Sequence, residues 1–271
     1  MKKQKKNLSQ GKETHMILVK KIQIPELPTE QPRRLYICLP KDYEKSDRRY
    51  PVLYLFDGHN VFYDRHATYG KSWGFREYLK KAKLPLILVA VECNPEGFRR
   101  LSEYSPWNFS APRPVGNVKG LGKVTMDWFT TVLKPEIDKE YRTLPDREHT
   151  MIAGSSLGGL MSLYAVVEYN HVFSRAAVLS PSLWVSPSKM KEMIRSHPLS
   201  DPTRIYIDMG TREIDPKRRA LSAMFDVAKG LSAMGADVSA NVIPGAEHNE
   251  AAWEKRIPDF MDYLCDGSFL V

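Results

Sequence analysis

The sequence predicts a single α/β domain in which a mainly parallel sheet carries helices on both faces. Short apolar runs alternate with longer helix-like stretches through most of the chain, an order typical of parallel sheets with helical crossovers. The length of 271 residues suits one large α/β domain. The sequence contains no repeat and no low-complexity linker, so we expect residues 16–271 to form one domain.

Apolar runs in the first part of the chain predict a series of strands. The run at 86–92 is apolar throughout, as expected of a strand that is buried on both faces of a sheet. Beyond it, apolar residues at helical spacing predict a helix over 122–141, which we expect Pro135 to bend or interrupt. The strands expected before this helix are 19–24, 33–39, 51–56 and 86–92.

The second half of the chain continues this alternation. The strands expected here are 150–154, 176–180, 204–210 and 238–245. Helix-like sequence follows them, most clearly at 157–168 and in the amphipathic stretch 250–264.

Residues 93–121 form the least regular stretch, rich in Pro, Gly and Asn. We expect a loop of about 25 residues here, and loops of that length are usually functional or mobile. The stretch follows the carboxyl end of the strand at 86–92, where α/β proteins place their ligand sites.

The positive charge is concentrated at the amino terminus. The formal net charge is +8, and the first twelve residues contain five lysines and no acid, which leaves +3 for the other 259 residues. A block of like charges repels itself, so we expect residues 1–15 to be a solvated basic tail. The alternative is a tail that binds nucleic acid or anionic lipid, in which case binding would weaken with salt.

We expect a cytoplasmic protein without a nucleic-acid or membrane partner. No apolar run approaches about 18 residues, the length that spans a bilayer. The early lysines are followed by polar sequence rather than by the apolar segment of a secretion signal.

The strongest chemical motif is GSSLGG at 154–159, which contains G-x-S-x-G with Ser156 at its centre. A buried strand precedes the motif and a helix follows it, which is the setting of a nucleophile elbow. The glycines let the turn fit against the neighbouring strand and helix, and the turn lifts the Ser156 hydroxyl clear of the sheet. The Leu157 N–H then lies at the helix start, where it can stabilise an oxyanion.

A serine nucleophile needs a base, and three histidines follow Ser156 in the chain. His171 ends the helix after the elbow, and His197 follows a short Lys-rich helix. His248 lies just past the last strand and before the last helix, which is where the base of such a site belongs. We therefore predict His248 as general base and acid.

The acidic partner should follow the strand at 204–210, where a carboxylate can bond the imidazole Nδ1–H and fix its tautomer. Glu213 is our first candidate, Asp215 the second and Asp208 the third, because Asp208 lies within the strand itself. The backbone N–H of His59, in the loop after the strand at 51–56, is the second predicted oxyanion donor.

We expect no metal and no cofactor. Asp57, His59, Asp64 and His66 lie close together in the sequence, but their spacing matches no familiar pattern of metal ligands.

With these residues in place, the sequence resembles the esterase D-like family of α/β-hydrolases. Its relatives include enterochelin-type siderophore esterases and the acetylxylan and feruloyl esterases of carbohydrate esterase family 1. The resemblance spans roughly residues 33–260 and is most specific at the elbow and at SPSLW, 180–184. It implies an α/β-hydrolase fold with Ser156 as nucleophile, His248 as base and Glu213 as acid.

The expected function is therefore hydrolysis of a small ester through an acyl-enzyme. Our leading substrates are acetyl or hydroxycinnamoyl esters of small carbohydrates or aryl alcohols. The alternatives are a cytoplasmic siderophore trilactone esterase and a catalytically silent binding protein, and a homo-oligomer is compatible with the sequence. The substrate-binding candidates are Asn60, Arg100, Tyr104, Trp107 and Trp184.

Overall fold

The computed structural model describes residues 15–82, 84–196, 198–213 and 219–265. The basic tail predicted over 1–15 therefore lies outside the described residues except at its last position, and so does the candidate acid Asp215. In the described part of the chain, no helix has the length and apolarity needed to cross a bilayer.

Within these described residues, the main sheet has eight strands in the order β1-β2-β4-β3-β7-β8-β9-β10. The pairs β1–β2 and β2–β4 are antiparallel, and the other neighbours are parallel. The mainly parallel sheet predicted from the sequence is thus confirmed. The strands are β1 Met16–Ile22, β2 Arg33–Leu39, β3 Val52–Leu55, β4 Ile87–Val91, β7 Thr150–Ser155, β8 Arg175–Leu179, β9 Arg204–Gly210 and β10 Asp237–Ile243.

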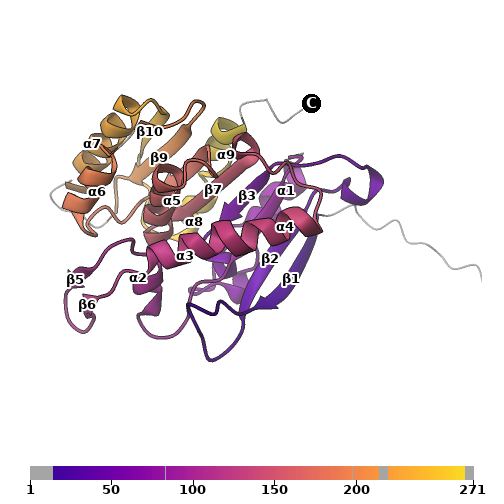
Figure 1. Cartoon of the computed structure of the whole chain (residues 1–271), viewed down its shortest axis with the longest axis horizontal. Helices are drawn as coiled ribbons and strands as arrows, with labels where there is room; N and C mark the ends of the chain where they lie inside the picture. Colours follow the sequence, from indigo (N-terminus) through magenta and orange to yellow (C-terminus); the bar gives the residue numbers. More distant parts are fainter. Residues whose placement is uncertain (1–14, 83, 197, 214–218, 266–271) are drawn as a thin grey trace, which may run out of the picture.

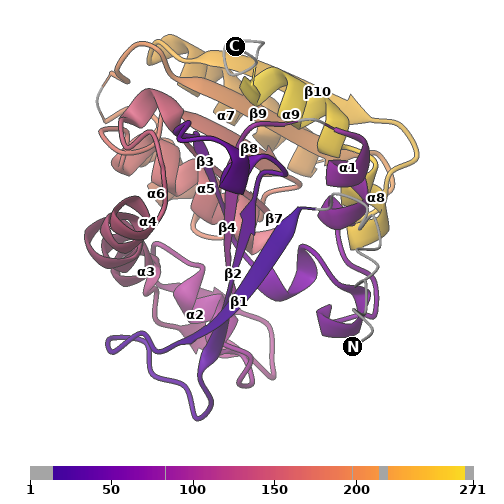
Figure 2. The same cartoon turned by 90° about the vertical axis from the view of Figure 1, so that its right-hand side faces the viewer.

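Helices cover both faces of this sheet (Figure 1). In Figure 2, α3 and α4 lie on one side of the strands and α1 and α8 on the other. The helices are α1 Phe75–Lys81, α2 Arg99–Glu103, α3 Gly122–Trp128, α4 Lys134–Glu140, α5 Leu157–Glu168, α6 Pro187–Met193, α7 Arg219–Ala233, α8 Glu250–Glu254 and α9 Ile257–Cys265.

Each face of the sheet has its own hydrophobic core. Because successive side chains of a strand point to opposite faces, neighbouring residues enter different clusters. Tyr54 and Ile152 pack under α3, α4 and α5, whereas Leu53 and Met151 pack under α1 and α9. Strands buried on both faces explain why their sequences are continuously apolar.

Two expectations need correction. The stretch 93–121 is not a structureless loop, because it contains α2 and a small hairpin of β5 Phe109–Ala111 and β6 Gly116–Val118. The helix predicted over 122–141 is continuous through α3, a π-helical segment Phe129–Leu133 and α4, so Pro135 does not interrupt it. The π-helical segment ends just before Pro135, which lacks the N–H that a regular helix would use.

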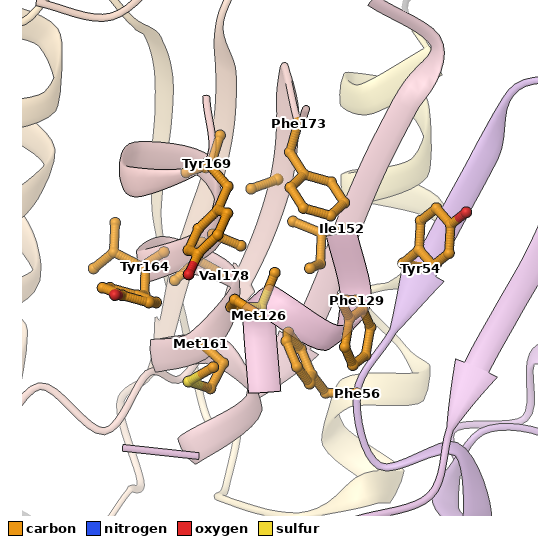
Figure 3. Packing of buried hydrophobic residues seen from close by; sticks show 14 of the residues in the cluster. Tyr54, Phe56, Met126, Phe129, Ile152, Met161, Tyr164, Tyr169, Phe173 and Val178 are labelled. Carbon is orange, nitrogen blue, oxygen red and sulfur yellow. The ribbon is translucent and has the colours of Figure 1, made fainter. Parts of the chain in front are cut away.

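Phe129 of the π-helical segment joins this helix to the sheet. Its ring lies 5.2 Å from the Phe56 ring and 6.3 Å from the Tyr54 ring, measured between centroids (Figure 3). Val132, in the same segment, is exposed.

We predict that Phe129→Ala lowers the free energy of unfolding by about 3–5 kcal/mol, because it opens a cavity between α3 and the sheet. Val132→Ala, the matched control in the same segment, should change it by less than about 0.5 kcal/mol. Urea unfolding monitored by circular dichroism measures both. Similar losses in the two variants would contradict the packing described here.

Candidate active site

Ser156 occupies a strained turn between β7 and α5. Its φ of 58° and ψ of −121° are rare for a residue with a side chain. A Cβ at Gly154 would lie 2.5 Å from the carbonyl carbon and oxygen of Gly158, so only glycine fits at that position. This is the strand–turn–helix geometry of a nucleophile elbow.

The Ser156 side chain lines a cavity and contacts a second serine. Its Oγ lies 3.4 Å from Ser182 Oγ. Ser156 and His248 line the same cavity, although no hydrogen bond joins their side chains within the described residues. Catalytic hydrogen bonds are often long in ligand-free sites and tighten when substrate binds.

His248 is held by Glu213. The ring lies between β10 and α8, with Nδ1 2.9 Å from Glu213 Oε2. An ionised carboxylate only accepts hydrogen bonds, so Nδ1 carries the proton and Nε2 remains free as a base. The Trp253 ring packs against the imidazole edge-to-face, with 5.1 Å between centroids.

The other oxygen of Glu213 is also bonded. Oε1 accepts hydrogen bonds from Ser180 Oγ and from the Gly210 N–H, each at 2.6 Å. Burial acts to raise the pKa of Glu213, but these bonds and the one from His248 outweigh it and leave the pKa below its ordinary value. Glu213 is therefore ionised at neutral pH.

Asp208, the third candidate acid, lies beneath this group rather than beside His248. Its side chain is fully buried in β9, and its Oδ1 accepts a hydrogen bond of 2.8 Å from Arg256 Nη1. Burial raises the pKa of Asp208 to about 6, against the opposing charge of Arg256.

The two predicted oxyanion donors come from different segments of the chain, the start of α5 and the turn after β3. Leu157 is the first residue of α5, where its N–H has no partner in a preceding helical turn. His59 lies in the single turn Gly58–Asn60 after β3 and lines the cavity with Ser156. A Cβ at Gly58 would lie 2.6 Å from the Ala90 carbonyl oxygen, so glycine lets this turn approach β4.

The cavity that contains Ser156 has a volume of about 940 Å³. Two of the predicted substrate-binding residues, Asn60 and Arg100, line it. Arg100 donates to both Asp57 oxygens, at 2.7 and 2.6 Å. Asn60 donates to Glu250 Oε1 at 3.4 Å and accepts from the Thr68 N–H.

Three predicted aromatic residues lie elsewhere. Tyr104 is buried below the cavity, where its hydroxyl accepts a hydrogen bond of 3.1 Å from the Asp57 N–H and so supports the loop after β3. Trp107 packs edge-to-face on Tyr164. Trp184 is 57% exposed and lines a separate groove between α6 and α7. The prediction that these three residues bind substrate beside Ser156 is therefore wrong, because none of them lines the cavity.

Two exposed aromatic residues that the sequence reading missed line the cavity instead. Tyr69 is 82% exposed and Phe98 is 54% exposed. They lie in the segments that follow β3 and β4, whose carboxyl ends meet the sheet edge that carries Ser156. The rule that places ligand sites at this edge would have been the signal for finding them.

The potential metal ligands do not assemble as the sequence order suggested. Asp64 bonds Ser72, and His66 contacts Tyr36. Asp57, His59 and Cys93 instead place ligand atoms within 4.8 Å of one another. This set is poorly suited to a cation, because the Arg100 guanidinium bonds both Asp57 oxygens and burial raises the pKa of the Cys93 thiol well above its usual range.

The arrangement of strands and elbow defines the fold class, which solved structures share. An IroE-like serine hydrolase from Shewanella oneidensis matches 92% of this chain and 79% of its own, with a TM-score of 0.72 and 20% identity. A ferulic acid esterase matches 93% of this chain and 98% of its own, with a TM-score of 0.67 and 17% identity. These likenesses confirm the predicted α/β-hydrolase fold.

The family follows from the sequence itself. A family model described as "Putative esterase" matches residues 28–264, and the chain belongs to this family. Uncharacterized protein YbbA of Bacillus subtilis (strain 168) is 25% identical over 242 residues, which cover 86% of this chain and 92% of the relative. The resemblance stated from the sequence is thus confirmed, and membership supports a carboxylic ester hydrolase.

Glu213 makes part of the stability pH-dependent. Because its folded-state pKa lies below the ordinary 4.5, its contribution to the free energy of unfolding is complete above about pH 4.5. It is lost as the pH falls through the folded-state pKa. We predict that Glu213→Gln loses less stability than the wild type as the pH falls from 7 to 3, because the Glu213 contribution is absent. Glu247→Gln, at an exposed carboxylate in the loop that carries His248, should lose as much as the wild type. Urea unfolding between pH 3 and 7 measures the difference, and parallel curves for wild type and Glu213→Gln would contradict it.

Proposed function

We propose that the chain is a serine carboxylic ester hydrolase in which Ser156, His248 and Glu213 form the catalytic triad. The observation that carries the proposal is the hydrogen bond of 2.9 Å between His248 Nδ1 and Glu213 Oε2. It leaves Nε2 as a free base in the cavity that Ser156 also lines. The strained turn at Ser156 presents the half-buried nucleophile to this cavity.

The reaction proceeds through an acyl-enzyme. Ser156 Oγ attacks the ester carbonyl carbon while His248 Nε2 takes the hydroxyl proton. The bond to the alcohol then breaks, and His248 returns the proton to the leaving oxygen. Water attacks the acyl-enzyme with His248 again as base, which releases the acid and restores Ser156. We expect that, when substrate binds, the Ser156 hydroxyl leaves Ser182 and forms a hydrogen bond to His248 Nε2.

Backbone N–H groups stabilise the tetrahedral intermediates. We assign this role to Leu157 at the start of α5 and to His59 after Gly58. Fixed donors of this kind act on charge that develops only during the reaction, so they lower the barrier rather than only binding the substrate.

The charge of the cavity favours an uncharged ester. Arg100 is paired with Asp57, and Arg34 with Glu92 at 2.5 Å, so these lining cations are already neutralised. Exposed aromatic rings at Tyr69 and Phe98 offer contact to a planar group. These features support acetyl or hydroxycinnamoyl esters of small carbohydrates or aryl alcohols over a strongly anionic ferric siderophore trilactone.

The first test compares wild type with Ser156→Ala on p-nitrophenyl acetate and butyrate. We predict that kcat/KM falls by at least about 1,000-fold, because the nucleophile is lost. A fluorophosphonate probe should label Ser156, as located by mass spectrometry. Ser232→Ala, at an exposed serine of α7, should keep both the labelling and the activity.

Absence of hydrolysis and of labelling in the wild type would overturn the proposed enzyme and favour the catalytically silent binding protein. Labelling on another serine would overturn the assignment of the nucleophile.

The second test concerns the acyl group. We predict that Tyr69→Ala and Phe98→Ala each lower kcat/KM for methyl ferulate about 5-fold more than for p-nitrophenyl acetate, because an aromatic contact contributes about 1 kcal/mol. Trp184→Ala, an exposed aromatic away from the cavity, is the control and should affect neither substrate. Equal effects of all three variants would contradict the proposed aromatic contact, and faster cleavage of a trilactone than of methyl ferulate would favour the siderophore esterase.

A further inference from the structure

A fully buried polar layer lies beneath the Glu213 carboxylate. Arg256, in the link between α8 and α9, is 1% exposed, and Asp208 of β9 is 0% exposed. Ser180, directly after β8, is also buried. Charged side chains are rarely buried to this extent unless they are paired. The partners of Arg256 and Asp208 therefore determine how this layer is stabilised.

The chemistry of its neighbours fixes the direction of the Ser180 hydroxyl. Trp253 Nε1 lies 3.0 Å from Ser180 Oγ, and Arg256 Nη1 lies 2.9 Å from it. Indole and guanidinium nitrogens only donate, so Ser180 Oγ accepts from both. Its own proton is then directed to Glu213 Oε1, 2.6 Å away. The φ of 44° at Ser180 is unusual for a residue other than glycine, and this strain is a feature of functional sites.

The two oxygens of Glu213 therefore have different partners. Oε1 accepts from Ser180 and from the Gly210 N–H, and Arg256 Nη2 lies 3.5 Å from it. Oε2 accepts from His248 Nδ1. With Oε1 held from below, the carboxylate can present only Oε2 to the imidazole.

The layer contains two carboxylates and one guanidinium. Arg256 pairs with Asp208 through Nη1 at 2.8 Å and approaches Glu213 through Nη2. Among the described residues, the other titratable groups that face the layer include Tyr206, beside Asp208 and Asp259, and His248, which is itself faced by Glu250. Two buried carboxylates without a counter-charge would share a proton, because both cannot ionise at low cost.

We propose, on the basis of the triad inferred above, that Arg256 and Ser180 are positioning residues that keep the Glu213 carboxylate ionised with Oε2 turned towards His248. Asp208 anchors Arg256 from the opposite side. Burial raises the pKa of Asp208 to about 6, whereas Glu213 stays charged for the reaction.

The direct test measures the Glu213 pKa by carboxyl carbon NMR in protein labelled at glutamate, with Ser156→Ala as the background so that no turnover is needed. We expect Ser180→Ala to raise this pKa by at least about one unit and Arg256→Met by at least about two units. Asp208→Asn combined with Arg256→Met should lower it again, because the competing carboxylate is gone.

Arg212→Met is the matched control, since Arg212 is an exposed arginine next to Glu213 in the chain. It should leave the Glu213 pKa unchanged. If Arg256→Met does not fold, Ser180→Ala and Asp208→Asn still test the proposal, because Asp208→Asn should lower the Glu213 pKa by giving it the whole charge of Arg256.

With Ser156 restored, the acid limb of the pH profile for kcat/KM on p-nitrophenyl acetate provides the functional measurement. Arg256→Met should lose about 2- to 4-fold more activity at pH 6 than at pH 8.5, because a pKa raised by two units leaves a large part of Glu213 protonated at pH 6. A purely structural role predicts equal losses at both pH values and an unchanged Glu213 pKa, and that result would overturn the proposal. Absence of wild-type esterase activity, with the Glu213 pKa shifts still observed, would instead refute the proposed function.

Discussion

The hydrogen bond between His248 Nδ1 and Glu213 Oε2 connects the two loops that leave the carboxyl ends of β9 and β10. The tautomer of the imidazole, and hence the presence of a free base in the cavity, depends on this contact. The contact in turn requires an ionised carboxylate with one oxygen already occupied. The Ser180 hydroxyl and the Gly210 N–H meet that requirement by donating to Oε1. The proposed chemistry of His248 therefore depends on groups that lie beneath Glu213.

Sheet topology explains why residues far apart in the sequence meet at one edge. Parallel strands all end at the same edge, so the segments after β3, β7, β9 and β10 converge there (Figure 1). Each segment contributes one part of the proposed machinery: an oxyanion donor, the nucleophile, the acid and the base. The glycines at Gly58 and Gly154 allow backbones to approach more closely than any side chain would permit.

The fold and the central residues were predictable because their signals are local. Apolar runs located the strands, and the positions of Ser156 and His248 after particular strands indicated them as the proposed nucleophile and base. The sequence position alone left Glu213, Asp215 and Asp208 open as the acid. The placement of aromatic residues was not predictable, because the burial of Tyr104 depends on its contacts with Phe56 and the Asp57 N–H, which lie far away in the sequence. The pairing of Arg256 with Asp208 joins residues 48 positions apart, and nothing in either local sequence indicates it.

A crystal structure of the protein inactivated by an alkyl phosphonate ester would test the central claim most directly, because the adduct resembles the tetrahedral intermediate. We expect phosphorus bonded to Ser156 Oγ, the phosphonyl oxygen about 3 Å from the backbone nitrogens of Leu157 and His59, and His248 Nε2 within hydrogen-bond distance of the Ser156 oxygen. An adduct on another residue, or a phosphonyl oxygen that points away from both nitrogens, would contradict the account.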